Sequence, residues 1–292
     1  MKLGIGLPNT LPVETDRELM LKWARLADEA GFHTLATIDK PAYDSWDPLV
    51  TLAGVASVTE RARLATTILQ LPTRNEVLVA KQAAVVDRLS GGRLDLGVAQ
   101  GGRKDDFEVL GASFAGRSAR FERQVGRLRE VWEAARSSDR DHGVTGPAPL
   151  QDPCPVWVGA SQKRAMERAV RIGDGFVFGT SGAARMGELT PSLRERAAAY
   201  GKTELPIAGL AYVGVGDDAE AALDEATRHT IRYYGRLWTD PEKLIHHGPA
   251  EKVADEVAAY ADSSIDLLIL FPQIPRLDQV EQLAATVLPA YR

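Results

Sequence analysis

The first candidate for acid–base chemistry is the pair Asp39-Lys40, which closes the apolar run 34–39 (TLATID). An adjacent carboxylate can orient a lysine, and the pKa of a lysine falls in a dry site, so the amine can exchange protons. An ion pair on a surface loop is the alternative. We expect Asp39 and Lys40 to be catalytic if that run is a strand ending at a pocket.

A second candidate is the segment 155–164 (PVWVGASQKR), where an apolar run ends in small and polar residues before a helical pattern begins near Lys163. Free backbone N–H groups at a helix start bind anions, and small residues let a phosphate approach closely. A tight turn with no ligand fits the pattern equally well. The anion reading assigns Gly159, Ala160, Ser161 and Gln162 to a phosphate loop.

Other chemistries lack their residues. The histidines His33, His142, His229, His246 and His247 fall outside the predicted strand ends, and we interpret His246-His247 as a solvated loop pair, not as metal ligands. No carboxylate pair of the glycosidase kind stands at strand ends, and no G-x-S-x-G motif occurs. The single cysteine, Cys154, allows no intramolecular disulfide and is expected to be structural. We predict no metal site.

The elements that position these residues alternate along the whole chain. Helical patterns such as 16–30 and 76–89 separate short apolar runs, which predict strands at 3–8, 34–39, 63–69, 94–99, 155–159, 175–179, 206–215 and 267–271. Eight strand–helix units predict an α/β fold, a single (β/α)₈ TIM barrel with insertions, over one domain, 1–292. An open doubly wound sheet is the alternative, but it favours a glycine-rich turn where residues 7–10 read LPNT.

A barrel gathers the carboxyl ends of its strands at one mouth, where active sites form. Asp39 and Lys40 would meet the phosphate loop there, together with Thr67, Ile68, Gln100, Gly101 and Gly179 from the other strand ends. Two polar connections, 136–153 and 232–250, exceed what barrel closure needs and are the predicted insertions. Topology alone does not place either of them over the mouth.

The overall composition excludes several partners. The chain has 292 residues with a net charge of −5, which gives no support for nucleic-acid binding. No stretch approaches the roughly 18–20 apolar residues of a membrane span, and the first residues lack the long apolar segment of a secretory signal. We therefore expect a soluble, cytoplasmic protein.

Several blocks resemble the luciferase-like family of flavin- and deazaflavin-dependent oxidoreductases. The most specific is 80–132, which contains SGGRLDLGVAQGG; supporting blocks are ADEAGFHTLATIDK at 27–40, RLATTIL at 63–69, VGASQKRAMERAVRIGDGF at 158–176 and GPAEKVADEV at 248–257. The resemblance spans nearly the whole chain. It implies a (β/α)₈ barrel that binds FMN or coenzyme F420 at its strand ends.

The resemblance also implies roles for individual residues. Asp39-Lys40 falls where many relatives have Asp-His beside the reactive ring, and the Thr67-Ile68 peptide falls where deazaflavin members often have a cis bond. Residues 159–162 match the phosphate loop.

Three departures from the family pattern are informative. Lys40 replaces the usual histidine, which removes a proton shuttle that titrates near neutrality. Gln100 replaces an arginine that contacts the FMN phosphate in luciferases, so we do not expect light emission. Gly102 replaces a catalytic glutamate of the sugar-phosphate dehydrogenase branch, which argues against that activity.

The expected function is a monooxygenase that uses reduced FMN and oxygen on a small organic substrate, with a separate flavin reductase as a possible partner. The alternatives are an F420-dependent reductase or dehydrogenase, and a catalytically silent barrel acting as a partner subunit. Family members often dimerise through helices of the first half, so we expect a homodimer, with Leu52, Val55, Leu78 and Val85 as candidate contacts. Candidate pocket aromatics are Tyr43, Trp46, Tyr233, Tyr234 and Trp238.

Overall fold

The computed structural model describes residues 1–11, 15–137 and 145–291. Its strands are β1 (Lys2–Gly6), β2 (Thr34–Thr37), β3 (Arg63–Thr66), β4 (Leu69–Gln70), β5 (Leu94–Ala99), β6 (Val156–Gly159), β7 (Gly175–Val177), β8 (Ile207–Val215), β9 (Ile245–Gly248) and β10 (Leu267–Pro272). Its α-helices are α1 (Arg17–Ala30), α2 (Pro48–Ala56), α3 (Glu76–Leu89), α4 (Lys104–Val109), α5 (Arg117–Arg136), α6 (Lys163–Ile172), α7 (Ala183–Ala199), α8 (Ala219–Tyr234), α9 (Pro241–Leu244), α10 (Ala250–Ala258) and α11 (Asp278–Gln282). Short turns of 3₁₀ or π helix are η1 (Leu71–Thr73), η2 (Ala261–Ser263), η3 (Leu283–Val287) and η4 (Leu288–Tyr291).

The strands form a closed parallel barrel, which confirms the predicted fold. Within the described chain the order is β10-β1-β2-β3-β5-β6-β7-β8, and the pairing of β8 with β10 closes the ring. All eight predicted strands are present. The predicted strand 63–69 is divided into β3 and β4. The short strand β9 pairs with the carboxyl end of β8.

Two helix starts follow directly from local sequence. The side chain of Asp16 accepts a hydrogen bond from the backbone N–H of Leu19 at the start of α1, and Asn75 caps α3 in the same way through Leu78. Gly31 ends α1 with a φ of 94°, a left-handed conformation that glycine adopts without a steric penalty. The predicted helices 16–30 and 76–89 are therefore confirmed almost residue for residue.

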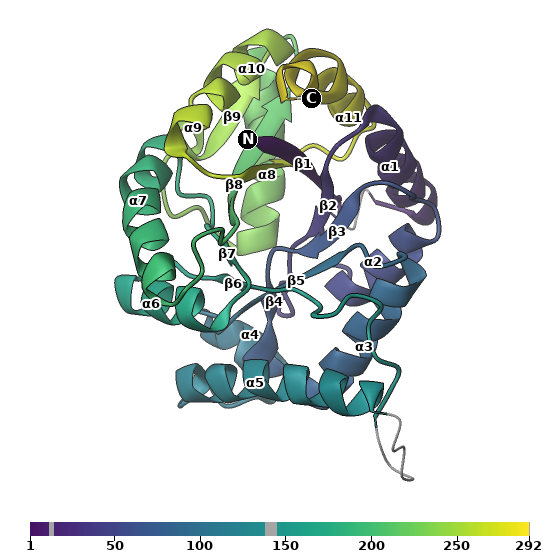
Figure 1. The fold of residues 1–292 in the computed structure, drawn as a ribbon. Coiled ribbons are helices and arrows are strands. Elements are labelled where there is room, and N and C mark those ends of the chain that lie inside the picture. The colour runs from purple at the N-terminus through teal and green to yellow at the C-terminus, as the bar shows by residue number, and fades with distance from the viewer. Residues whose placement is uncertain (12–14, 138–144, 292) are drawn as a thin grey trace.

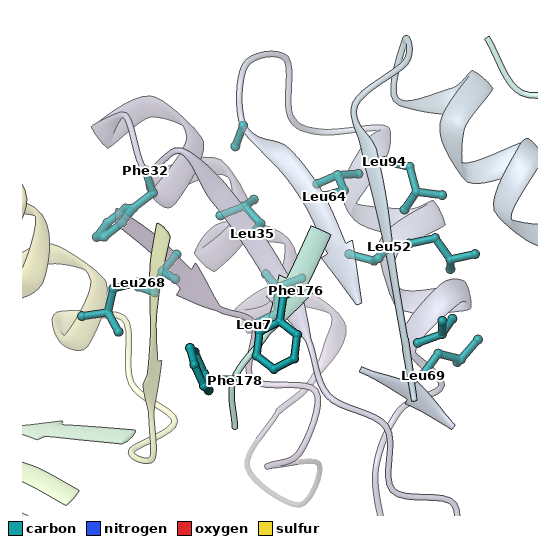
Figure 2. Close-up of a cluster of buried hydrophobic side chains, with 14 of the residues drawn as sticks. Leu7, Phe32, Leu35, Leu52, Leu64, Leu69, Leu94, Phe176, Phe178 and Leu268 are labelled. Atoms are coloured by element: carbon teal, nitrogen blue, oxygen red, sulfur yellow. The ribbon is translucent and has the colours of Figure 1, made fainter. Parts of the chain in front are cut away.

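The buried side chains divide between the two faces of the barrel sheet. Figure 2 shows the outer layer, where Leu35, Leu64 and Leu94 from β2, β3 and β5 lie near Leu52 of α2. A second cluster fills the inside of the barrel and includes Leu210 and Phe271. The outer cluster holds the helices on the barrel, and the inner one forms the floor beneath its mouth.

Helix α8 belongs to the inner cluster, which the sequence did not indicate. Ala222 and Ala226 belong to the same cluster as the residues of the barrel interior, and in the view of Figure 1 α8 overlaps the centre of the barrel. Gly214 of β8 permits this approach, because a Cβ there would lie 3.0 Å from the Cβ of Ala226. The connection 232–250 thus begins at the mouth, where α8 ends.

The sequence interpretation of His246-His247 as a solvated loop pair is wrong. Both residues are half-buried in β9, and His246 bonds Glu256 at 2.9 Å and the Tyr260 hydroxyl at 3.0 Å. Residues 245–248 pair with the carboxyl end of the long strand β8, and this pairing makes them a strand and not a loop. Cys154 is buried, and burial raises the pKa of its thiol.

The other predicted insertion, 136–153, lies partly outside the described residues. Its described part contacts the opposite end of the barrel, where Gln151 bonds Asp87 and Arg63. This described part therefore lies away from the mouth. Of the predicted dimer contacts, Leu52 and Val55 are wrong because both are fully buried, whereas Leu78 and Val85 are exposed.

Candidate active site

A cavity of about 400 Å³ opens at the carboxyl ends of the strands. That size falls within the range of about 300–1,000 Å³ typical of small-molecule sites. The predicted site residues that line it are Asp39, Lys40, Thr67, Ile68, Gln100, Gly101, Gly159, Ser161, Gln162 and Gly179. Ala160 does not line it and packs against the outer core instead.

Asp39 does not orient Lys40, contrary to the sequence interpretation. Its carboxylate accepts two hydrogen bonds from the Arg74 guanidinium, at 2.7 and 3.0 Å, and one from the backbone N–H of Gln70 at 2.8 Å. Arg74 also reaches Asp47 at the start of α2. Asp39 therefore links the end of β2 to β4 through Gln70 and to α2 through Arg74. Both of its oxygens accept hydrogen bonds, so neither is free to act as a base.

Lys40 pairs with Asp106 of α4, at 3.9 Å between Nζ and Oδ2. The lysine side chain is 11% exposed and the aspartate side chain is fully buried. The Lys40 ammonium lies 4.8 Å from the centre of the Tyr234 ring, within the range of a cation–π interaction. Burial lowers the pKa of Lys40, and the nearby Asp106 partly offsets that effect.

The end of α8 covers part of the mouth with aromatic side chains. The hydroxyl of Tyr234 bonds that of Tyr212, which points inward from β8, and both residues line the cavity. Arg103 donates to the carbonyl of Tyr234 at 2.8 Å and also bonds Tyr43 and Asp105. Arg103, in the loop after β5, thereby holds the end of α8 over the mouth, and we call this end of α8 the lid.

The remaining aromatic candidates are dispersed. Tyr43 lies under the Arg103 guanidinium, and Tyr233 is buried beside Tyr234. Trp238 is 52% exposed, and Trp46 lines a separate apolar groove between α1 and α2. Only Tyr234 of the five lines the cavity within the described chain.

The phosphate-loop candidates lie at the start of α6. Gly159 ends β6, Ser161 and Gln162 line the cavity, and no side chain caps the first turn of this ten-residue helix. The N–H groups of that turn therefore remain available to an anionic ligand. The geometry matches what the sequence suggested for residues 159–162, with Ala160 as the exception.

Arginines from two helices supply the positive charge that Gln100 lacks. Gln100 accepts hydrogen bonds from Arg168 of α6 at 2.7 Å and from Ser118 of α5 at 2.6 Å. Arg117, the first residue of α5, lines the cavity; its Nε donates to the carbonyl of Gly101 and its guanidinium stacks on Phe114 at 3.7 Å. The sequence missed Arg117 and Asp106 because neither lies at a strand end.

The wall between Lys40 and the phosphate loop is built from β3 to β5. The Thr67–Ile68 peptide is cis and lines the cavity, as the family resemblance implied. Next to it, Gln70 donates to Asp106 at 2.9 Å, while its own Oε1 is buried without a hydrogen-bond partner.

Metal and membrane features are absent from the described part of the chain. No group of three or more His, Cys, Asp or Glu side chains among residues 1–11, 15–137 and 145–291 is arranged to hold a metal ion. No helix in the same ranges is long and apolar enough to cross a bilayer.

Comparisons with known proteins agree with this geometry. The oxygenase component of the flavin-dependent trigonelline monooxygenase of Acinetobacter baylyi is 26% identical, over 84% of this chain and 73% of that protein. An F420-dependent glucose-6-phosphate dehydrogenase of Kribbella flavida is 30% identical, over 88% of this chain and 82% of that protein. The crystal structure of the monooxygenase RslO1 from Streptomyces bottropensis superposes with a TM-score of 0.85, covering 100% of both chains at 22% identity.

The family profile "luciferase-like monooxygenase" matches residues 1–267. The named relatives are flavin- or F420-dependent monooxygenases and dehydrogenases, which confirms the prediction of an oxidoreductase. The chain belongs to the luciferase-like monooxygenase family.

Proposed function

We propose that this protein is the oxygenase component of an FMN-dependent monooxygenase that acts on a small organic substrate. Reduced FMN comes from a separate flavin reductase in this proposal, as the name "oxygenase component" of the trigonelline relative suggests for that protein. When bound, reduced FMN supplies two electrons to molecular oxygen, so that one oxygen atom enters the substrate and the other leaves as water.

The donor set of the cavity fits FMN. The uncapped first turn of α6, with Ser161 and Gln162, offers N–H and O–H groups for a phosphate, and Arg117 adds a positive charge. Gln70 has an unpartnered Oε1 in the wall, which suits an N–H donor of a flavin-type ring after a small shift of the side chain. The walls between these two places include the apolar side chains of Ile38, Ile68 and Leu210.

The hydrogen bonds already made by the carboxylates of the cavity favour monooxygenation over dehydrogenation. Oxidising an alcohol by hydride transfer requires a base that takes the hydroxyl proton. Among the described residues that line the cavity, Asp39 is bound to Arg74, Asp106 is bound to Gln70 and the N–H of Ala42, and none is a histidine. Oxygen insertion with reduced FMN needs no such base.

The F420-dependent alternative is favoured by one observation. The lowered pKa of Lys40 makes its amine a candidate base beside the cavity. The silent-subunit alternative is less consistent with the site, because the mouth is an open cavity reached by Ser161 and Gln162 and is not plugged by side chains.

Cofactor binding and oxygen consumption test the proposal. We expect FMN to bind with micromolar or better affinity, measured by quenching of its fluorescence, and F420 to bind at least tenfold more weakly. Reduced FMN supplied by any flavin reductase should support substrate-dependent oxygen uptake. Tight F420 binding without oxygen uptake would favour the alternative, and tight binding of neither cofactor would contradict both.

We also propose that the protein forms a homodimer. Leu78, Val85 and Leu89 of α3 and Val50 of α2 are exposed apolar side chains. Light scattering on purified protein should give twice the mass of 31.6 kDa. Leu78→Glu should shift the protein to the monomer.

A further inference from the structure

The Lys40 ammonium has hydrogen-bonding capacity that this chain does not use. Its Nζ donates no hydrogen bond to another described residue, and its nearest carboxylate oxygen is 3.9 Å away. That carboxylate, on Asp106, already accepts from the N–H of Ala42 at 3.1 Å and from Gln70 at 2.9 Å. Asp106 therefore balances the charge of Lys40 without filling its donor positions.

The surroundings of Lys40 define what can fill those positions. The ammonium lies at the cavity wall beside the Tyr234 ring, and Tyr212, Ile38 and Leu210 line the same cavity. An ammonium with free N–H donors binds an anionic oxygen, and an aromatic and aliphatic wall binds an apolar body. Lys40 follows β2, whereas Arg117 begins α5 after β5 and the start of α6 follows β6, so β3 separates Lys40 from the nearer of these two groups proposed for the cofactor phosphate.

We propose that Lys40 is the receptor for the carboxylate of the substrate, and that the substrate is a compact aromatic carboxylic acid. Its ring would lie against Tyr234 and the aliphatic wall, and its carboxylate would accept hydrogen bonds from the Lys40 ammonium. The inference rests on the proposed function for its position next to the flavin. Lys40 acts here as a binding residue, and no covalent step is assigned to it.

Equilibrium binding of two matched probes tests this inference. Benzoate and benzamide have nearly the same shape but differ in charge, and calorimetry on the FMN-loaded protein measures both dissociation constants. We expect benzoate to bind roughly 10- to 100-fold more tightly than benzamide, the effect of a charge-assisted hydrogen bond in a buried site. Lys40→Met should abolish this preference, and Lys40→Arg should retain part of it.

Controls separate the inference from the proposed function. Lys22→Met, at an exposed lysine of α1 that pairs with Glu18, should leave both probe affinities unchanged. FMN affinity is measured for each variant by fluorescence quenching, and Lys40→Met should keep it within about threefold. The same titrations are run without cofactor; if wild-type protein binds no FMN but still prefers benzoate there, the proposed function fails and the inference stands.

Three outcomes would overturn the inference. Equal affinities for benzoate and benzamide would show that the site does not select an anion. A preference that persists in Lys40→Met would assign it to another cation. A loss of FMN affinity in Lys40→Met as large as the loss of benzoate affinity would place Lys40 against the cofactor.

Discussion

The two ends of the barrel each contain an ion pair with a buried carboxylate, but the pairs differ in geometry. At the amino ends of the strands, Arg63 of β3 forms two hydrogen bonds of 2.6 Å with Asp95 of β5 and also bonds Gln151 at 3.1 Å. At the mouth, Lys40 and Asp106 are 3.9 Å apart and share no hydrogen bond. We call the hydrogen-bonded Arg63–Asp95 pair closed, and the Lys40–Asp106 pair, which has no hydrogen bond between its members, open.

This difference separates structure from function. A guanidinium fork bonds both oxygens of a carboxylate at once, whereas an ammonium 3.9 Å away keeps its donors for another partner. Asp39 and Arg74 resemble the closed pair, although they lie beside the cavity. Position at a strand end therefore does not make a carboxylate catalytic; the geometry of its partner decides whether it is available.

The largest expected effect is on stability. Arg63→Met leaves the Asp95 carboxylate buried without its partner, so we expect the free energy of unfolding to fall by about 3 kcal/mol. Lys40→Met removes the counter-charge of Asp106, but Asp106 keeps its hydrogen bonds from Gln70 and the N–H of Ala42, so we expect a smaller loss of about 1 kcal/mol. Urea denaturation followed by circular dichroism measures both, and equal losses would show that the mouth pair is as structural as the other.

The next effect is on the cofactor. Arg117→Leu removes the cavity-lining cation proposed for the phosphate, and we expect the dissociation constant of FMN to rise about 10- to 100-fold. The matched control is Arg127→Leu on the same helix, where the side chain is half-exposed and pairs with Glu130. An unchanged FMN affinity in Arg117→Leu would remove Arg117 from the proposed site.

The mouth should lose ligand affinity in alkali. Burial lowers the pKa of Lys40, and the ammonium is the form that binds a carboxylate, so benzoate affinity should be constant near neutral pH, where benzoate is ionised, and fall as the pH rises through the pKa of Lys40, below the ordinary value of 10.5. The charged and titratable groups that face Lys40 are Asp39, Arg103, Asp105, Asp106, Tyr233 and Tyr234. Calorimetry from pH 7 to 10.5 measures this fall, and Lys40→Arg should move it to higher pH. A flat profile in the wild type would contradict the assignment.

The opposite end should lose stability in acid, by a smaller amount. Burial and the nearby Lys2 and Arg63 lower the pKa of His33 to about 4 from 6.5. The folded state therefore disfavours the protonated ring, and its contribution, complete above pH 6.5, is lost as the pH falls from 6.5 towards 4. Because the ring is partly exposed and screened, we expect about 1 kcal/mol. His33→Gln should flatten this part of the stability curve in urea denaturation; an unchanged slope would refute the assignment.

The sequence alone determined the barrel and most of the strand-end residues at its mouth. Eight apolar runs separated by helical patterns allow few other arrangements, and parallel strands bring all their carboxyl ends together. Asp39, Lys40 and Gly159 could therefore be placed at one cavity although 120 residues separate the first from the last.

Only the tertiary structure decided the partners of those residues and the position of α8. Arg74 and Asp106 occupy positions beyond the strand ends, and their choice of Asp39 and Lys40 depends on distances that periodicity does not encode. An amphipathic pattern likewise specifies that α8 buries one face but not which surface covers it. The glycine at position 214 lets that face pack against the carboxyl-terminal end of β8, so that α8 covers part of the mouth beside Lys40.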